Sequence, residues 1–449
     1  MKKIFQYIML AVVTIVMASC TSDIEETTAT TGKNNVQLVV GEFPAFGDSQ
    51  TRAIGTPDEG KTSWAEGDEL LLEMTSETFG TNYAAFKYNG SSWKLTSGEL
   101  VYLEGDPAYI PHVYYAPNYK WEAGELVLKK GKAAGTDECI EGKARITGNG
   151  ETITVSFAEA TRKYSRLRIA TLPNEQITVD TEYFTPAGSS DMEQNGNYTL
   201  TSDEKGNAYL YGTFENNSEV TVKYREAALT TYTFSQATEN AKSYALDATV
   251  ISANSAEEIK SAIEQKVADG KTTIRLNLAP NAGTNEFMAI REAIKGAAPN
   301  DLGTIELTII GVETIPEEAF YKMLQLKSVR MSDVKEIKKY AFKECQYLTV
   351  VEAPSLNKLY SGAFKKCDQL SKLTFGPINY ADTRNWPIFE YITPNIDLIL
   401  SDYQKEMIET DSYLYTANND RDYAGSDEHN SKNFLGREFR SITCRYKVK

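Results

Sequence analysis

The sequence predicts a multidomain protein in which N-terminal all-β sandwiches precede an α/β solenoid of short repeats. Its 449 residues exceed what one hydrophobic core usually organises. Between about Val36 and Asp247, short apolar–polar alternations are separated by turn residues. Near the carboxyl end, the phrases AFYKMLQL, AFKECQYL and AFKKCDQL begin at residues 319, 341 and 363, each 22 residues after the last. A fixed period of this length is typical of stacked repeats.

The composition supports folded domains with an acidic surface. Apolar residues make up 41% of the chain, which is enough for packed cores. The formal net charge is −15, so nucleic acid and anionic lipid headgroups are unfavourable partners. The charges are spread along the chain, as expected for a solubilising surface.

Residues 1–19 have the features of a signal peptide. Lys2 and Lys3 precede an apolar stretch from Ile8 to Met17 that is short for a membrane-spanning helix. No later segment approaches 18 consecutive apolar residues. The sequence therefore predicts export.

The residues around Cys20 indicate which kind of exported protein this is. Met17-Ala18-Ser19-Cys20 resembles the lipobox of bacterial lipoproteins, which implies cleavage before Cys20 and attachment of its acyl chains to outer-membrane lipid. An ordinary secretory signal with a chance cysteine is the alternative. Residues 20–35 read as a flexible tether, and its acidic start, with Asp23, Glu25 and Glu26, resembles the surface-export signal of Bacteroidota lipoproteins. A plain solvated linker is the other interpretation of that run.

The first half predicts many short strands. They are rich in Val, Ile, Thr, Tyr and Phe, which suit a pleated, half-buried surface. Gly and Asn in EGD (66–68), NG (89–90) and EKGN (204–207) suit tight turns. We expect two β-sandwich domains, at 36–160 and 161–250. The expected strands are 37–40, 69–73, 84–88, 109–116, 125–129, 152–157, 165–170, 176–179, 208–214, 219–224 and 231–234.

This half resembles the fimbrillin (Mfa-like) family of Bacteroidota surface lipoproteins. The resemblance rests on TRAIG (51–55), KTSWAEGDELLL (61–72), VYYAPN (113–118), SRLRIA (165–170), AYLYGTF (208–214) and ENAKSYALDAT (239–249). It implies transthyretin-like or sandwich domains at the cell surface, sometimes within a fimbria. In some fimbrillins an early Arg is a protease cut that frees a groove for a neighbour's donor strand. Arg52 is the positional candidate, and an exposed loop arginine is the alternative interpretation.

The second half contains six apolar columns at the 22-residue period. Such columns indicate one unit stacked on copies of itself, each burying its apolar groups against the next. The pattern I-x-x-x-A-F-x-x-C-x-x-L-x-x-V resembles the BspA-type leucine-rich repeat. The expected repeat core comprises Ile315, Ala319, Phe320, Ile337, Ala341, Phe342, Cys345, Leu348, Leu359, Ala363, Phe364, Cys367 and Leu370.

Each repeat ends in a short strand whose alternate residues should face outward. These strands are LKSVRM, LTVVEA and LSKLTF, and their stacking predicts a narrow parallel sheet. The outward positions form the candidate ligand face. They are Ser328, Arg330, Val350, Glu352, Lys372 and Thr374.

The repeats at 312–379 lie within a larger predicted domain, 251–449. Its N-terminal part, 251–311, is expected to form longer coils that contain two helices, at 255–270 and 285–296. Ser255 and Glu258 form a capping box at the start of the first helix. After residue 375 the period slips, because Leu398 lies 25 residues beyond Leu373. Residues 380–449 are expected to form an irregular coil and a C-terminal cap.

The sequence contains no motif for catalysis, cofactor or metal. G-x-S-x-G, G-x-x-x-x-G-K-[ST] and H-E-x-x-H are missing, and the only histidines are His112 and His429. The loop 418–429 resembles a calcium loop only in part, since Ala424 stands where a ligand is required. Without a C-x-x-C pair, Cys345 and Cys367 fit either a disulfide or stacked free thiols, and Met323 in the same column favours free thiols.

We therefore expect a surface-exposed outer-membrane lipoprotein that acts without catalysis as an adhesion or protein-interaction module. Its repeats would contact a protein or glycan ligand. One alternative is a fimbrial accessory subunit assembled by donor-strand exchange. A second is a glycan-binding lipoprotein of a nutrient-uptake system, with Tyr119 and Trp121, or Tyr380 and Trp386, stacking on sugar rings. No feature of the sequence sets an oligomeric state.

Overall fold

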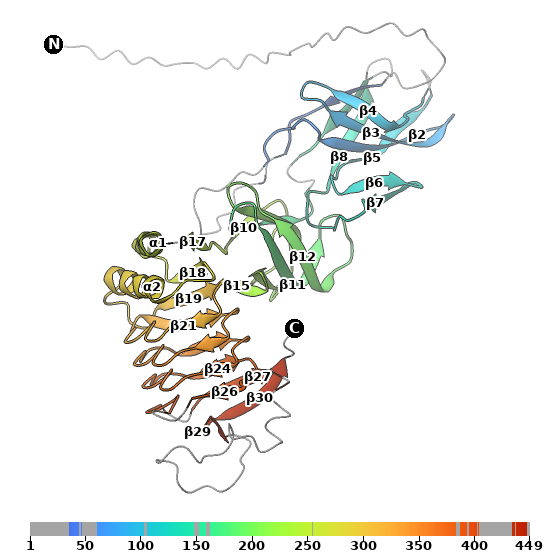
Figure 1. Ribbon diagram of the computed structural model, residues 1–449. Coiled ribbons are helices and arrows are strands. Elements are labelled where there is room, and N and C mark those ends of the chain that lie inside the picture. The colour runs from blue at the N-terminus through green and yellow to red at the C-terminus, as the bar shows by residue number, and fades with distance from the viewer. Residues whose placement is uncertain are drawn as a thin grey trace, which may run out of the picture.

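The computed structural model describes residues 36–44, 46, 61–102, 106–147, 152–158, 162–253, 255–382, 387–392, 395–401, 403, 433–435 and 437–446. Within these residues the chain is mostly β-strand, arranged in several sheets, with two helices (Figure 1). The described part of 36–253 contains strands and no α-helix, so the all-β character expected for it is confirmed. Neither described helix has the length and apolar run that a membrane crossing requires.

The first sheet has seven strands in the order β1-β9-β8-β5-β2-β3-β4. Its strands pair antiparallel except for β1, which runs parallel to β9 at the edge. A separate hairpin, β6–β7, packs over Leu71 and Ala85. The bounds are β1 (Gln37–Val40), β2 (Glu69–Ser76), β3 (Gly80–Tyr88), β4 (Trp93–Gly98), β5 (Ala108–Tyr115), β6 (Tyr119–Glu122), β7 (Glu125–Leu128), β8 (Ile140–Thr147) and β9 (Thr152–Ser156).

The second sheet also has seven strands, in the order β15-β14-β11-β13-β10-β16 with β12 paired to β11. The long strand β11 pairs with β14 through Thr178–Thr181 and with β13 through Phe184–Pro186. Strand β11 therefore changes its pairing partner from β14 to β13 midway along its length. The bounds are β10 (Ser165–Ala170), β11 (Gln176–Pro186), β12 (Glu193–Thr201), β13 (Asn207–Phe214), β14 (Glu219–Tyr224), β15 (Ala227–Thr233) and β16 (Ser243–Asp247).

A buried ion pair lies where the first two sheets meet. The Arg162 guanidinium donates to both carboxylate oxygens of Glu138, at 2.9 and 3.2 Å. It also donates to the Pro44 carbonyl and lies 4.0 Å from the centre of the Phe46 ring. Because the Arg162 side chain is fully buried, its charge is tolerated only with these partners. The segment that follows β1 is thereby held between the two sheets.

The third sheet has eight parallel strands in the order β17-β18-β19-β21-β23-β25-β27-β30. Across it, Val329, Val351 and Leu373 are register partners at the 22-residue period, and Leu373 pairs with Leu398 after 25 residues. The bounds are β17 (Ile251–Ala253), β18 (Thr273–Leu278), β19 (Ile305–Ile310), β21 (Leu326–Met331), β23 (Val350–Ala353), β25 (Lys372–Phe375), β27 (Asp397–Ser401) and β30 (Ser441–Tyr446).

Shorter ladders complete the strands of this part of the chain. A four-stranded parallel sheet has the order β20-β22-β24-β26, and its strands follow the same 22-residue register. Their bounds are β20 (Thr314–Ile315), β22 (Glu336–Ile337), β24 (Lys358–Leu359) and β26 (Tyr380–Ala381). A two-stranded pair, β28 (Asn433–Phe434) with β29 (Arg437–Glu438), lies near the C-terminal end.

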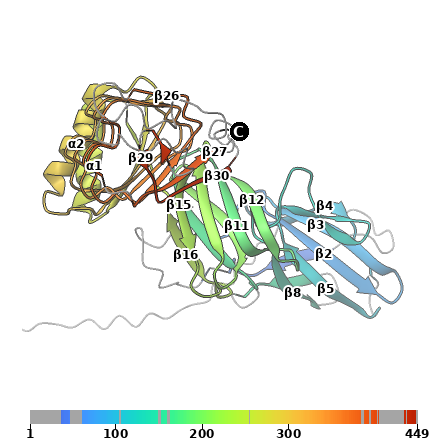
Figure 2. The same ribbon diagram turned by 90° about the horizontal axis from the view of Figure 1, so that it is seen from below.

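Both expected helices are present. Helix α1 (Ala256–Ala268) begins at Ser255, whose hydroxyl accepts from the Glu258 amide, as the capping pattern predicts. Helix α2 (Thr284–Ala297) begins after Gly283, whose amide donates to the Glu286 carboxylate. Their apolar faces pack on the same core as the third sheet. Figure 2 shows both helices on the side of the repeats that faces away from the second sheet.

Candidate functional site

The six predicted ligand-face residues lie on neighbouring strands of the third sheet. Their register forms two rows across β21, β23 and β25. Lys372 is exposed and the other five are half-buried, while the alternate residues Val329, Val351 and Leu373 are fully buried. The first row is Ser328, Val350 and Lys372, and the second is Arg330, Glu352 and Thr374.

A continuous apolar column supports this face from behind. The Phe320, Phe342, Phe364 and Phe389 rings follow one another with centroids 5.0 to 5.6 Å apart. All thirteen residues expected in the repeat core are buried, and eleven of them are 0% exposed. Close packing of this kind fixes the backbone beneath the outward side chains. The face is therefore a rigid surface.

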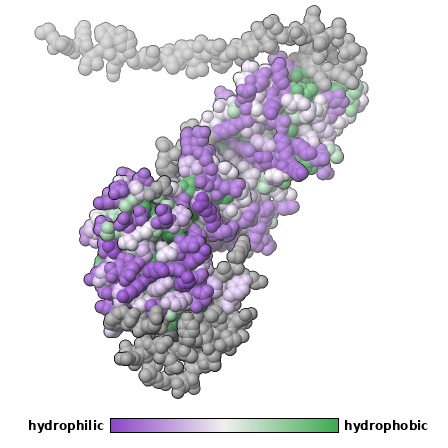
Figure 3. Space-filling view, viewed as in Figure 1, coloured by the Kyte–Doolittle hydropathy of each residue, from purple (hydrophilic) through white to green (hydrophobic). Residues whose placement is uncertain are grey.

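Charges on the outward face are paired between adjacent coils. Arg330 Nε lies 2.9 Å from Glu352 Oε2, and Lys327 Nζ lies 2.8 Å from Glu306 Oε1. On the short parallel ladder, hydrogen bonds from Lys338 and Lys358 lower the pKa of Glu336. Exposed pairs contribute little stability. The pair of Arg330 with Glu352 does cancel two of the charges on the face. The surface of the repeats in this view is largely hydrophilic (Figure 3).

One end of the face is covered by the second sheet. Arg275 and Thr308 belong to the same row as Arg330, but they are 6% and 3% exposed. Arg275 Nε donates to the Leu229 carbonyl of β15 at 2.6 Å, and Ile310 packs in the core of the second sheet. The exposed part of the face therefore begins at β21.

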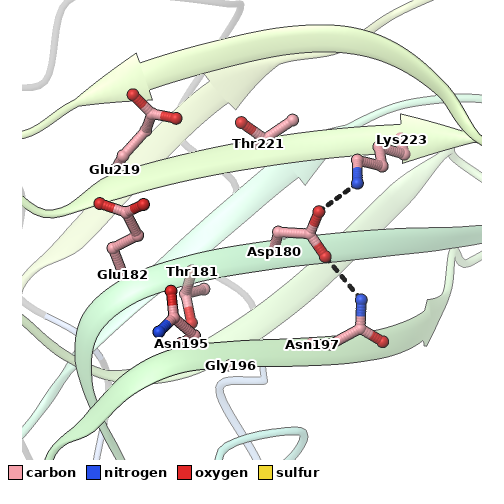
Figure 4. A pocket seen from close by; sticks show the side chains of 9 residues that line it. All are labelled: Asp180, Thr181, Glu182, Asn195, Gly196, Asn197, Glu219, Thr221 and Lys223. Carbon is pink, nitrogen blue, oxygen red and sulfur yellow. Dashed lines mark hydrogen bonds and ion pairs between the residues drawn. The ribbon is translucent and has the colours of Figure 1, made fainter. Parts of the chain in front are cut away.

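A cleft of about 420 Å³ lies on the second sheet, over β11, β12 and β14 (Figure 4). At one end Asp180 forms an ion pair with Lys223 and accepts from the Asn197 amide. Glu182 and Glu219 lie at the other end. Its lining is polar apart from glycine.

Comparison with protein families decides the nature of the repeats. Residues 302–413 match the family model of the BspA type leucine rich repeat region, with six copies. The chain contains a BspA-type leucine-rich repeat region. A comparison with curated proteins found no match. The leucine-rich repeat region is longer than the three copies that share the AF phrase, because coils such as the one around Phe389 depart from that phrase.

The cysteines of the leucine-rich repeat region are free thiols. Cys345 and Cys367 Sγ donate to the Phe320 and Phe342 carbonyls, each at 3.0 Å, and not to one another. Burial raises the pKa of the Cys345 thiol to about 12. These thiols act as small apolar side chains of the core.

Three of the remaining candidates, His112, Tyr119 and Trp121, belong to the first sheet and to the hairpin beside it. His112 Nδ1 lies 2.7 Å from Glu141 Oε1 in the first sheet, beside Tyr114. Tyr119 is buried, and Trp121 packs against Tyr83. No group of three or more His, Cys, Asp or Glu able to hold a metal occurs among the described residues. Cys20, Arg52, Trp386, His429 and the 418–429 loop lie outside the described residues.

Sequence reasoning missed the cleft. The sequence does contain a pattern that could have indicated it, namely polar residues at alternate positions of three strands. Examples are Asp180 and Glu182 on β11 and Asn195 and Asn197 on β12. Only the pairing of β11 with both β12 and β14 brings them onto one surface.

Proposed function

We propose that this protein is a surface-anchored, non-enzymatic adhesion or protein-interaction module that contacts its ligand mainly through the leucine-rich repeat region. The observation that carries the proposal is the exposed face on β21, β23 and β25, built on a fully buried core. Repeat regions of this type suit adhesion and protein–protein contact because they present an extended surface on a rigid support.

The order of the two β-rich parts and the repeats along the chain supports a protein that holds its repeats away from the membrane. The first sheet, the second sheet and the repeats follow one another along the chain and in space (Figure 1). We propose that acylated Cys20 inserts in outer-membrane lipid and that the two β-rich parts, of fimbrillin type, separate the repeats from the membrane. The ligand-binding region would then lie far from the lipid.

The pairing of charges on the face bears on the kind of ligand. Since Arg330 and Glu352 neutralise each other, the face has no strong field to attract a polyion. We propose a protein ligand recognised by hydrogen bonding and shape, with affinity that changes little with salt.

A binding screen tests the proposal. The purified chain is passed over immobilised extracellular-matrix proteins and glycans, beside a variant with Arg330→Ala and Glu352→Ala, which keeps the net charge. We expect at least one matrix protein to bind the parent chain and to bind the variant at least about fivefold more weakly. Absence of binding to every surface, or equal binding by the variant, contradicts the proposal. Binding to glycans alone supports instead a glycan-capturing lipoprotein.

One observation favours the fimbrial alternative as a second candidate. β1 precedes Arg52 and, among the described strands, pairs with β9 alone, while Leu38 and Phe43 are buried in the first sheet's core. Cleavage at Arg52 would separate β1 from the domain and expose the β9 edge to a donor strand. This alternative predicts high-mass, heat-labile assemblies that disappear in Arg52→Ala. Persistence of the assemblies in that variant excludes this route.

A further inference from the structure

A short segment after β1 bridges the first and second sheets. It comprises Phe43, Pro44 and Phe46, which we call the strap. Phe43 is 5% exposed and packs in the core of the first sheet. Three residues later, the centre of the Phe46 ring lies 4.0 Å from the guanidinium carbon of Arg162 and 4.6 Å from that of Arg166 on β10. One stretch of chain is thus anchored in both β-rich parts.

The surroundings of Phe46 include β10 and the residues just before it. The ring of Tyr164 lies with its centroid 6.5 Å from that of Phe46. Arg162 is 1% exposed and donates to the Pro44 carbonyl at 2.5 Å. A buried guanidinium that loses an acceptor and an aromatic face is destabilised. The start of the second sheet is therefore stabilised by the strap.

Backbone hydrogen bonds join the same two parts beside the strap. Tyr211 on β13, whose ring centroid lies 6.3 Å from that of Phe46, donates its amide to the Gly135 carbonyl at 2.7 Å. The Gly135 amide donates to the Ala187 carbonyl at 3.3 Å. Gly135 has a φ of 77°, and a Cβ there would lie 2.8 Å from the Tyr211 carbonyl oxygen. We call this close contact the joint, and the amides of Gly135 and Tyr211 the joint amides.

The strap also ties the joint to the position of β1. Phe46 follows Phe43 by three residues, and Phe43 follows Val40, the last residue of β1, by three. Three residues of extended chain span at most about 11 Å. A larger displacement of Phe43 must draw Phe46 away from Arg162. Withdrawal of β1 from β9 therefore removes the strap from the joint.

We propose that the strap is a conformational lock between the two β-rich parts, which holds the joint closed while β1 is paired with β9 and releases it when β1 is withdrawn. This inference goes beyond the proposed function and does not depend on it. With the lock closed, the first and second sheets move as one body. With the lock open, the joint loses the contacts of Phe46 and Pro44 and opens more often. Because residues 1–35 lead directly into β1, a force or partner acting on them acts on the lock.

Hydrogen exchange of the purified full chain tests the lock, with the joint amides as the readout. Phe46→Ala removes the ring beside the two arginines. Leu38→Ala weakens the packing of β1, because Leu38 is 7% exposed in the core of the first sheet. The matched controls are Phe79→Ala, at a 43% exposed position after β2, and Met74→Ala, at a buried position of β2 in the same core as Leu38.

We expect Phe46→Ala to accelerate exchange of both joint amides by about tenfold, because two cation–π contacts are lost. Leu38→Ala should accelerate it by at least about threefold, because a less firmly packed β1 withdraws more often. Phe79→Ala and Met74→Ala should change it by less than about twofold. The amides of β14 report folding of the second sheet and should keep the parent's protection in every variant.

The other results overturn the proposal. If the joint amides exchange at the parent's rate in Phe46→Ala, the strap does not hold the joint. If Phe46→Ala accelerates exchange and Leu38→Ala does not, the strap is a static brace that β1 does not control. Equal acceleration in Phe79→Ala or Met74→Ala, or lost protection of β14, would assign the effect to general destabilisation.

Discussion

The rings of Phe342 and Phe364, 22 residues apart in the chain, stack with their centroids 5.3 Å apart and their planes 7° from parallel. Both side chains are fully buried. The stack continues to Phe320 on one side and Phe389 on the other. A periodicity in the sequence thus becomes a column in space, and the strands that present the outward face depend on it.

This column gives a stability prediction. Phe342→Ala should lower the free energy of unfolding of the leucine-rich repeat region by about 3–5 kcal/mol, because it removes a buried ring and leaves a cavity. Lys372→Ala, at an exposed position, should change it by less than about 0.5 kcal/mol. The protection of the β21, β23 and β25 amides from hydrogen exchange measures the change in stability of each variant. Unchanged protection in Phe342→Ala would show that the ring is not part of the core.

A second prediction concerns backbone strain in the repeats. Two positions in each of the three repeats that share the AF phrase have positive φ, and the second of them is occupied by Lys322 (56°), Glu344 (62°) and Lys366 (58°). Residues other than glycine adopt this conformation at a cost. Lys366→Gly should therefore stabilise the repeats by about 0.5–1 kcal/mol, while Lys366→Val should destabilise them by at least as much. Chemical denaturation measures the difference, and a stabilising valine contradicts this account.

Thiol reactivity gives a third prediction. At pH 8 a thiol with a pKa near 12, as for Cys345, is ionised to only about one part in ten thousand, and its thiolate is the reactive species. Iodoacetamide should leave Cys345 and Cys367 unmodified in the native chain and should modify both in denaturant. Mass spectrometry of the digested chain reads each site. A Cys345–Cys367 disulfide in the native chain would contradict the free-thiol assignment.

The junction between the second sheet and the repeats predicts acid sensitivity. Burial raises the pKa of Asp247, but hydrogen bonds from Thr249 and the charges of Arg275 and Lys266 outweigh it and hold the pKa below its ordinary value. Because the folded pKa is lowered, this stabilisation is complete above the unfolded pKa of about 4 and is lost as the pH falls through the folded value. Asp247→Asn should thus flatten the loss of thermal stability below pH 4.

The control for this prediction is Asp301→Asn, which removes an exposed carboxylate elsewhere in the same part of the chain. Melting temperatures between pH 6 and pH 2 for the parent and the two variants provide the comparison. An equally steep acid dependence in Asp247→Asn would show that the junction carboxylate does not contribute.

The repeats were predictable because their information is local and periodic. The 22-residue spacing alone places Leu307 beside Val329 and Ile309 beside Met331, and the structure confirms both pairs. Phe389 was not assigned to the phenylalanine column, because it follows Phe364 by 25 residues and lies outside the shared phrase. An insertion hides a period even where the packing is kept.

The first half was less predictable because its pairing is non-local. β12 was missed, since its sequence EQNGNYTLT is polar on one face and short of apolar residues on the other. The parallel pairing of β1 with β9 joins segments more than a hundred residues apart, which no alternation pattern encodes. From the sequence alone, Arg162 would be placed at the surface, because its partners Glu138 and the Pro44 carbonyl are distant in the chain. Its burial depends entirely on tertiary partners.

Attachment of cells that display the chain tests the central claim most directly. Val350→Arg places a bulky charge in the middle of the outward face, whereas Lys366→Ala alters an exposed position on the turn edge of the same repeats. With surface display equalised by antibody staining, we predict that Val350→Arg reduces attachment to a bound matrix protein by at least about tenfold and that Lys366→Ala leaves it unchanged. Undiminished attachment of the Val350→Arg cells would contradict the assignment of the ligand to this face.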